Sequence, residues 1–146
     1  SRRLAEEIAR AHRHGRPLGL VMFDLDHFKR INDRHGHDAG DAVLRGVMEV
    51  VRQRVRLGDA IGRWGGEEFM LLLPESALPN TLVTAERLRA GIEAQRFALA
   101  ERVTASFGVV VLERGEGFDA LVKRADVALY RAKSAGRNRV ETVSKD

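Results

Sequence analysis

The chain has 146 residues, which suits one domain with a hydrophobic core of its own. Its hydrophobic content of 44% and charged content of 32% are typical of a globular protein, and no apolar run is long enough to span a membrane. Because the chain has no cysteine, it has no disulfide framework, no thiolate metal site and no cysteine nucleophile. We therefore expect a cytoplasmic domain that makes no membrane contact itself.

The formal net charge is +4 and the sequence pI is about 10.1, and arginine supplies most of the positive charge. Arginine suits planar, bidentate recognition of phosphate and guanine. A basic, solvated surface explains the charge better than duplex binding does, and aromatic residues at 5% argue against a protein that stacks on single-stranded bases. We therefore expect no nucleic-acid partner.

Hydrophobic spacing predicts helices that alternate with strands along the chain. The expected helices cover 1–14, 27–32, 38–55, 80–95 and 118–134; the expected strands cover 18–23, 60–61, 69–73, 103–111 and 137–143. The stretch 32–41 is rich in turn-forming polar residues and predicts a loop. Because a hairpin near residue 65 forces an antiparallel pair, the fold class is α+β rather than doubly wound.

That hairpin is predicted by the segment Arg63-Trp64-Gly65-Gly66-Glu67-Glu68-Phe69, which lies between two apolar runs. A two-residue Gly-Gly turn of type I′ is the simplest connection, because it needs a positive φ at both central residues. Glu67 and Glu68 then leave the turn together and, on a strand, point to opposite faces. A divalent cation would relieve their repulsion; the alternative is a hairpin with two solvated glutamates.

A second pair of acids follows the apolar run 18–23, where a carboxylate is costly unless it is paired or bound to metal. We expect Asp24 to bind metal, and Asp26 to cap the helix that begins at His27 or to have another structural role. His35 and His37 lack further clustered ligands, so we expect them to pack within a loop rather than bind zinc.

Two other charged groups admit ordinary structural explanations. Arg56 and Asp59 flank a glycine turn after a predicted helix, which by itself fits a surface ion pair at a helix end. Lys133 and Arg137 bracket the end of the last predicted helix, where cations interact favourably with the helix dipole.

Five separate segments together resemble one family, the GGDEF diguanylate cyclases. They are 23–33, 36–41, 63–69, 104–108 and 125–138, and they occur in the family's order over nearly the whole chain. The resemblance implies a palm-like α+β fold, similar to nucleotidyl cyclases and polymerases, with a central five-stranded, mostly antiparallel sheet flanked by helices. It also implies condensation of two GTP into cyclic di-GMP and two pyrophosphates. Glu67 stands where the family name has aspartate, a variation that also occurs in active members.

The resemblance implies a Mg²⁺ or Mn²⁺ site made of Asp24, Glu67 and the backbone carbonyl of Leu25. Glu68 is implied either as the group that helps deprotonate the attacking 3′-hydroxyl or as a ligand of a second metal. Asn32 and Asp41 are implied to recognise guanine. The other implied substrate contacts are Gly65, Gly66, the backbone N–H groups of His27, Phe28 and Lys29, and the side chains of Lys133 and Arg137.

The implied reaction needs an antiparallel homodimer, because each domain binds one GTP. Arg56, Asp59 and Arg87 resemble the product-binding inhibitory site of the family. Two rivals remain: a non-catalytic cyclic di-GMP-binding module that uses these three residues, and a different palm-type cyclase acting on GTP or ATP. Residues 1–146 are expected to be a single GGDEF catalytic domain from a larger multidomain signalling protein, since the family's usual opening motif is missing.

Overall fold

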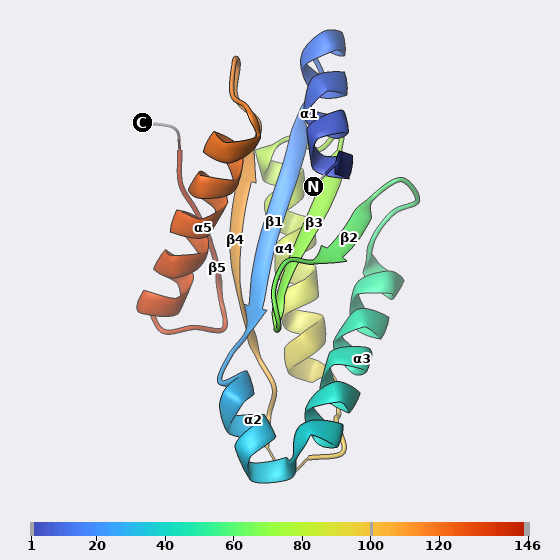
Figure 1. The fold of residues 1–146 in the computed structure, drawn as a ribbon, viewed down its shortest axis with the longest axis vertical. Coiled ribbons are helices and arrows are strands. Elements are labelled where there is room, and N and C mark those ends of the chain that lie inside the picture. Colours follow the sequence, from blue (N-terminus) through green and yellow to red (C-terminus); the bar gives the residue numbers. More distant parts are fainter. Residues whose placement is uncertain (1, 100, 145–146) are drawn as a thin grey trace.

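The computed structural model describes residues 2–99 and 101–144, so Ser1, the first residue of the first predicted helix, lies outside the described residues. The described chain alternates helices and strands much as the sequence predicts (Figure 1). The elements are α1 (Arg2–His14), β1 (Leu18–Leu25), α2 (Phe28–His35), α3 (His37–Arg54), β2 (Ala60–Arg63), β3 (Glu68–Pro74), α4 (Leu78–Ala94), β4 (Ala105–Val111), α5 (Phe118–Ser134) and β5 (Val140–Thr142).

The strands form one sheet in the order β2-β3-β1-β4-β5. The pairs β2–β3, β3–β1 and β1–β4 are antiparallel and β4–β5 is parallel, so the prediction of a mostly antiparallel five-stranded sheet is confirmed. All eight residues of β1 are buried. This burial explains the continuous apolar run, because a central strand covered on both faces has no polar side.

Successive β1 side chains alternate between two hydrophobic layers. Val21 and Phe23 belong to the cluster that includes residues of α2, α3 and α4, whereas Leu20 and Met22 belong to the cluster formed with α1 and α5. Asp24 continues the even-numbered side of the strand. Its carboxylate therefore faces the layer that contains α5.

Helix α5 lies directly against β4 at Gly108. A Cβ atom added to this glycine would lie 2.4 Å from the backbone nitrogen of Leu129 and 2.7 Å from the carbonyl oxygen of Ala125. Both of these are backbone atoms of α5, so a side chain at residue 108 could be accommodated only by moving the helix. The glycine therefore fixes the height of α5 above the sheet.

The predicted loop over 32–41 is wrong. Helix α2 continues to His35 and α3 begins at His37, so only Gly36, with a φ of 91°, separates the two helices. The polar residues of this stretch lie on helices, and the Nε2 atom of His35 contacts the Oε2 atom of Glu101 at 3.0 Å. A glycine in the left-handed region ends α2 and allows the chain to turn at one residue.

The predicted type I′ turn is also wrong. The connection between β2 and β3 runs from Trp64 to Glu67, and neither Gly65 nor Gly66 is among the residues with a positive φ. The carbonyl oxygen of Glu68 accepts hydrogen bonds from the backbone N–H groups of Trp64 (2.8 Å) and Gly65 (3.3 Å). This wider turn carries both glycines and Glu67 beyond the strands.

Among the described residues, no helix is both long enough and apolar enough to cross a membrane.

Candidate active site

The candidate site is centred on Asp24, near the end of β1. Glu68 of β3 and Ser106 of β4 are its direct partners across the sheet, and only 6% of its surface is exposed. The Lys133 side chain, from the last turn of α5, donates a hydrogen bond to the Oδ2 atom. The Oδ1 atom is buried and has no hydrogen-bond partner within the described chain. A buried carboxylate oxygen without a partner is costly, which marks this position as a site for a further ligand.

The pKa of Asp24 is raised above its ordinary value of 3.8, mainly because the group is buried. The hydrogen bond and positive charge of Lys133 oppose this rise, whereas the negative charges of Glu67 and Glu68 add to it. The favourable interaction with Lys133 is therefore smaller than the combined effect of burial and the two neighbouring carboxylates on the pKa of Asp24. An additional cation would stabilise the ionised form.

The strand register differs in one respect from the arrangement expected around Asp24. Glu68, rather than Glu67, lies directly opposite Asp24, so these two side chains share a face of the sheet. Glu67 precedes β3, and its carbonyl oxygen accepts the N–H of Leu25 at 3.4 Å. Both glutamate side chains are half-buried.

The donor set at this end of the sheet fits a hard divalent cation. Asp24, Glu67 and Glu68 offer carboxylate oxygens, the Leu25 carbonyl offers another oxygen, and Mg²⁺ and Mn²⁺ prefer such ligands. Within residues 2–99 and 101–144, no three His, Asp or Glu side chains are already grouped in a way that could hold a metal ion. The side-chain oxygens would therefore have to move closer together around a bound cation.

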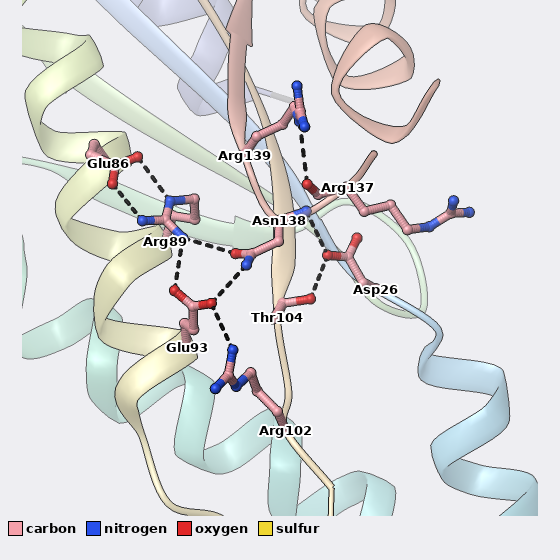
Figure 2. A network of polar contacts seen from close by, with 9 residues as sticks. All are labelled: Asp26, Glu86, Arg89, Glu93, Arg102, Thr104, Arg137, Asn138 and Arg139. Carbon is pink, nitrogen blue, oxygen red and sulfur yellow. Dashed lines mark hydrogen bonds and ion pairs between the residues drawn. The ribbon is translucent and has the colours of Figure 1, made fainter. Parts of the chain in front are cut away.

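The prediction that Asp26 caps α2 is wrong. Its Oδ2 atom accepts hydrogen bonds from Thr104 Oγ1 (2.7 Å) and from the backbone N–H of Asn138 (3.0 Å), and its Oδ1 atom accepts one from Ser106 Oγ (2.6 Å). Asp26 thus has the alternative, structural role. Figure 2 shows its contacts with Thr104 and Asn138.

As a consequence, α2 begins without a side-chain cap. The residue before the helix is His27, in the left-handed conformation with a φ of 57°, and it makes no capping hydrogen bond. The first N–H groups of a helix have no acceptor within that helix. The backbone N–H groups at Phe28 and Lys29 are therefore suited to bind an anion that lies beside Asp24.

Asn32 and Asp41 are brought together by a close contact between α2 and α3. A Cβ atom added to Gly40 would lie 1.8 Å from the Oδ1 atom of Asn32, so the amide of Asn32 lies directly on the backbone next to Asp41. Asp41 also lines an open groove of about 640 Å³ whose wall includes Arg63 and Phe69. Of the two residues predicted to recognise guanine, Asp41 thus lines the groove, and Asn32 contacts the residue that precedes Asp41.

The two predicted phosphate cations differ in their surroundings. Lys133 is 34% exposed and is paired with Asp24, as described above. Arg137 follows α5 with a φ of 64°, and its side chain is exposed. Its backbone N–H donates to the carbonyl of Ala132 at 2.9 Å, which closes the end of the helix.

Sequence reasoning missed the residues that hold this end of the site together, namely Thr104, Ser106, Asn138 and Arg89. Thr104 and Ser106 could have been predicted from the sequence, because hydroxyl residues two positions apart on a strand face the same side and can both donate to one carboxylate. Asn138 and Arg89 could not, since they meet only in the folded chain.

Arg56 and Asp59 form a tight turn after α3 at the opposite side of the β2–β3 hairpin. Asp59 Oδ2 accepts the backbone N–H of Arg56 at 2.9 Å, and the Arg56 guanidinium donates to the Pro74 carbonyl at 3.3 Å. The Arg56 side chain is 64% exposed, but that of Asp59 is only 3% exposed. The guanidinium also lies 3.7 Å from Asp59 Oδ1. Because most of the Arg56 side chain is exposed, it remains accessible to a further partner, whereas Asp59 shapes the turn.

Arg87 lies on the exposed side of α4. The guanidinium of Arg54, at the end of α3, lies against Gly91, with Nε at 2.6 Å from a Cβ built there, and Gly46 contacts Phe97. These contacts show that α3 and α4 run in opposite directions. Arg87, one turn before Gly91, is therefore displaced toward the side on which Arg56 follows α3.

Comparison with known proteins agrees with this geometry. The family model described as "Diguanylate cyclase, GGDEF domain" matches residues 1–139. The chain is 49% identical over 144 residues to diguanylate cyclase DgcP of Pseudomonas aeruginosa, covering 97% of this chain and 22% of DgcP. The chain thus spans about a fifth of the length of that relative.

Two solved structures share the fold closely. One is the GGDEF domain of DgcB from Caulobacter crescentus in complex with c-di-GMP, with a TM-score of 0.92 and 33% identity, covering 97% of this chain and 86% of that one. The other is the active GGEEF domain of a diguanylate cyclase from Vibrio cholerae, with a TM-score of 0.91 and 34% identity, covering 99% and 97%. On these grounds, the chain belongs to the GGDEF domain family of diguanylate cyclases.

Proposed function

We propose that this domain condenses two molecules of GTP into cyclic di-GMP and releases two pyrophosphates. The observation that carries the proposal is the buried, partnerless Oδ1 atom of Asp24 beside Glu67 and Glu68. It lies close to an uncapped helix start at His27. A place for a cation beside a place for an anion is what a nucleoside triphosphate with its metal requires.

Asp24, Glu67 and the Leu25 carbonyl would hold Mg²⁺ or Mn²⁺. When bound, the cation supplies charge stabilisation at the α-phosphate and lowers the pKa of the attacking hydroxyl. Glu68 lies opposite Asp24 and can accept the proton of that hydroxyl or complete a second metal site. In each of two steps, a 3′-oxygen bonds to the α-phosphorus of the other nucleotide, and the α–β phosphoanhydride bond breaks with loss of pyrophosphate.

The remaining residues bind and orient the nucleotide. Asp41 accepts the N1–H and 2-amino group of guanine, which adenine cannot supply, and Asn32 is held beside it by Gly40. The phosphates are held by the backbone at the start of α2 and by Lys133 and Arg137. Gly65 and Gly66 are exposed in the hairpin turn, where the absence of side chains leaves room for the ribose and phosphates.

Ring closure requires two domains that face each other in an antiparallel pair, so that each presents its 3′-hydroxyl to the α-phosphate of the other. We place the reaction in the cytoplasm, where GTP is supplied. Product feedback is assigned to the surface formed by Arg56, Asp59 and Arg87, because arginine and aspartate together match the Hoogsteen and Watson–Crick edges of guanine. Product bound there would hold domains out of the catalytic arrangement.

The decisive experiment incubates the purified domain, stripped of bound nucleotide, with GTP and Mg²⁺ and measures cyclic di-GMP and pyrophosphate. The expected result is two pyrophosphates for each cyclic product, with a rate per domain that rises when the protein is concentrated about a hundredfold, because pairs form by mass action. Glu68→Gln should abolish product formation. Binding of cyclic di-GMP without any turnover would instead identify a non-catalytic binding module, and equal use of ATP would identify a different cyclase.

A further inference from the structure

The turn that follows α5 has an unusual backbone. Gly136, Arg137 and Asn138 have φ angles of 131°, 64° and 46°, so three consecutive residues have a positive φ. The left-handed conformation is unfavourable for a non-glycine residue, and it persists where surrounding contacts determine it. The contacts that determine it here also fix the direction of Arg137.

Asn138 is held at each of its hydrogen-bonding side-chain groups and at its backbone N–H. The N–H donates to Asp26 Oδ2 at 3.0 Å, the Oδ1 atom accepts from Arg89 Nη1 at 2.9 Å, and the Nδ2 atom donates to Glu93 Oε2 at 2.8 Å (Figure 2). One partner, Asp26, directly follows β1, and the other two, Arg89 and Glu93, lie on α4. Together they restrict the rotation of Asn138. Arg137, immediately before it, is constrained by the same contacts.

Arg89 is itself fixed on α4. Its Nε and Nη2 atoms donate to the two carboxylate oxygens of Glu86 at 2.8 and 2.6 Å, and its Nη1 atom donates to Glu93 at 3.0 Å. Its side chain is only 17% exposed. The hydrogen bond to Glu86 is the main reason that the pKa of Arg89 is raised further above its ordinary value. Because the guanidinium is a rigid plane, these bonds direct the remaining Nη1 donor at Asn138.

The other end of the network reaches the start of α2. Asp26, which accepts the N–H of Asn138, is 6% exposed and immediately precedes the uncapped N–H groups from His27 to Lys29. One asparagine therefore connects both segments to which we assign phosphate contacts, the helix start and Arg137. Among the described residues, only Arg89 donates a hydrogen bond from α4 to the side-chain oxygen of that asparagine.

We propose that Arg89 is a positioning residue for the triphosphate end of the active site and acts through Asn138. It holds the amide of Asn138, which sets the left-handed turn, the direction of Arg137 and, through Asp26, the start of α2. This inference rests on the proposed function for the assignment of the phosphate contacts, and it adds a residue on α4, a helix to which we assign no contact with the substrate GTP.

The test measures binding, so that it does not depend on turnover. The probes are 3′-deoxy-GTP, which cannot condense because it lacks the attacking hydroxyl, and 3′-deoxy-GMP, which keeps the guanine but lacks the two outer phosphates. Both are titrated in Mg²⁺ into the wild type, Arg89→Ala and Asn138→Gly. Glycine keeps the left-handed conformation at low cost, so Asn138→Gly removes the side-chain contacts without forcing the backbone to change.

The readout is the ratio of the two affinities, which a general loss of stability would not move. We expect the preference for the triphosphate to fall about tenfold in each variant, the effect of losing one charge-assisted contact, with little change for the monophosphate. The double variant should bind no worse than either single variant, because both remove the same connection. Additive losses would overturn the proposal that Arg89 acts through Asn138.

Arg102→Ala is the matched control. Arg102 donates to the same Glu93 Oε2 atom at 3.2 Å, but its side chain is 70% exposed and, among the described hydrogen bonds, it makes none with Asn138. Its affinity ratio should equal that of the wild type. An unchanged ratio in Arg89→Ala would overturn the positioning role. If the wild type itself did not prefer the triphosphate, the phosphate assignment of the proposed function would fail instead, and the positioning role with it.

Discussion

Lys133 donates a hydrogen bond to one carboxylate oxygen of Asp24, while the other oxygen is buried and has no hydrogen-bond partner in the part of the chain that the structure describes. The lysine therefore neutralises the acid only in part. The Lys133 side chain is one-third exposed, so we expect it to be able to leave Asp24 if a cation binds there. In the proposed function, this pair would link the binding of a cation at Asp24 to the release of Lys133 for the phosphates.

Replacing Asp24 with asparagine should make the metal-free domain more stable at neutral pH. The pKa of Asp24 is raised above 3.8, first because of burial. Such a group stabilises the folded state fully below its unfolded pKa, and this contribution is lost as the pH rises through the folded pKa. Asparagine avoids the loss, so its Tm should exceed that of the wild type by about 3 °C, the equivalent of roughly 1 kcal/mol for this length.

Thermal unfolding in EDTA checks this across the acid and neutral range. The difference in Tm between Asp24→Asn and the wild type should grow as the pH rises from about 4 and then level off. Asp33→Asn, at an exposed position on α2, provides the control and should show no such growth. A difference that stays constant at every pH would contradict the assignment to Asp24 ionisation.

Asp41→Ala should damage the use of GTP selectively. Asp41 lines the groove beside Asn32, and its loss removes the acceptor for two guanine donors. We expect kcat/KM for GTP to fall about 100-fold while the low activity with ATP hardly changes. Asp38→Ala, one turn earlier on α3 and exposed, is the matched control. Equal losses with the two nucleotides would show that Asp41 does not select the base.

Arg56→Ala should weaken product inhibition. Its guanidinium is exposed, donates to the Pro74 carbonyl and lies 3.7 Å from Asp59 Oδ1. The turn itself is closed by the Arg56 backbone N–H and Asp59 Oδ2, so removal of the Arg56 side chain should leave it intact. The cyclic di-GMP concentration for half-inhibition, with each protein normalised to its own initial rate, should rise about tenfold, the value of one arginine–guanine contact. Arg114→Ala, in the loop after β4, should leave it unchanged. Unaltered inhibition in Arg56→Ala would remove Arg56 from the regulatory site.

Gly40→Ala should raise the KM for GTP although alanine favours a helix. The new methyl group would lie 1.8 Å from Asn32 Oδ1 and 3.2 Å from Phe28 Cζ, so the amide must leave its place beside Asp41. The gain in helix propensity of about 1 kcal/mol should partly offset the strain in the free energy of unfolding. Gly62→Ala, where a Cβ meets nothing within 4 Å, is the control. A normal KM in Gly40→Ala would mean that Asn32 is not needed for guanine binding.

The order and type of the elements were predictable because the hydrophobic periods are clear. The absence of a side-chain cap at the start of α2 was not predictable. An aspartate before a helix favours a local cap, but Asp26 instead binds Thr104 and Asn138, which are 78 and 112 positions away in the sequence. The three hydrogen bonds that Asp26 accepts from distant residues outweigh one hydrogen bond to the start of its own helix. Such distant partners cannot be predicted from the sequence near Asp26.

The β2–β3 turn shows a different limit. Two adjacent glycines favour a type I′ turn, but they are equally compatible with a negative φ, so the pair does not fix the turn. In the structure the carbonyl of Glu68 accepts two N–H groups and the turn is wider. The sequence thus pointed to Asp24, Glu67 and Glu68 as candidates, but not to how the two glutamates are placed relative to Asp24.

The close approach of α5 to Gly108 has a mechanical consequence. Where backbone meets backbone, no layer of side chains can rearrange to absorb a displacement, so α5 and β4 move as one rigid body. We therefore expect the backbone at Lys133 on the helix to keep a constant distance from the backbone at Ser106 on the strand. Any adjustment to a substrate would then involve the rotamers of Lys133 and the exposed β2–β3 turn. A side chain introduced at residue 108 would push α5 away from β4 and so separate Lys133 from Asp24.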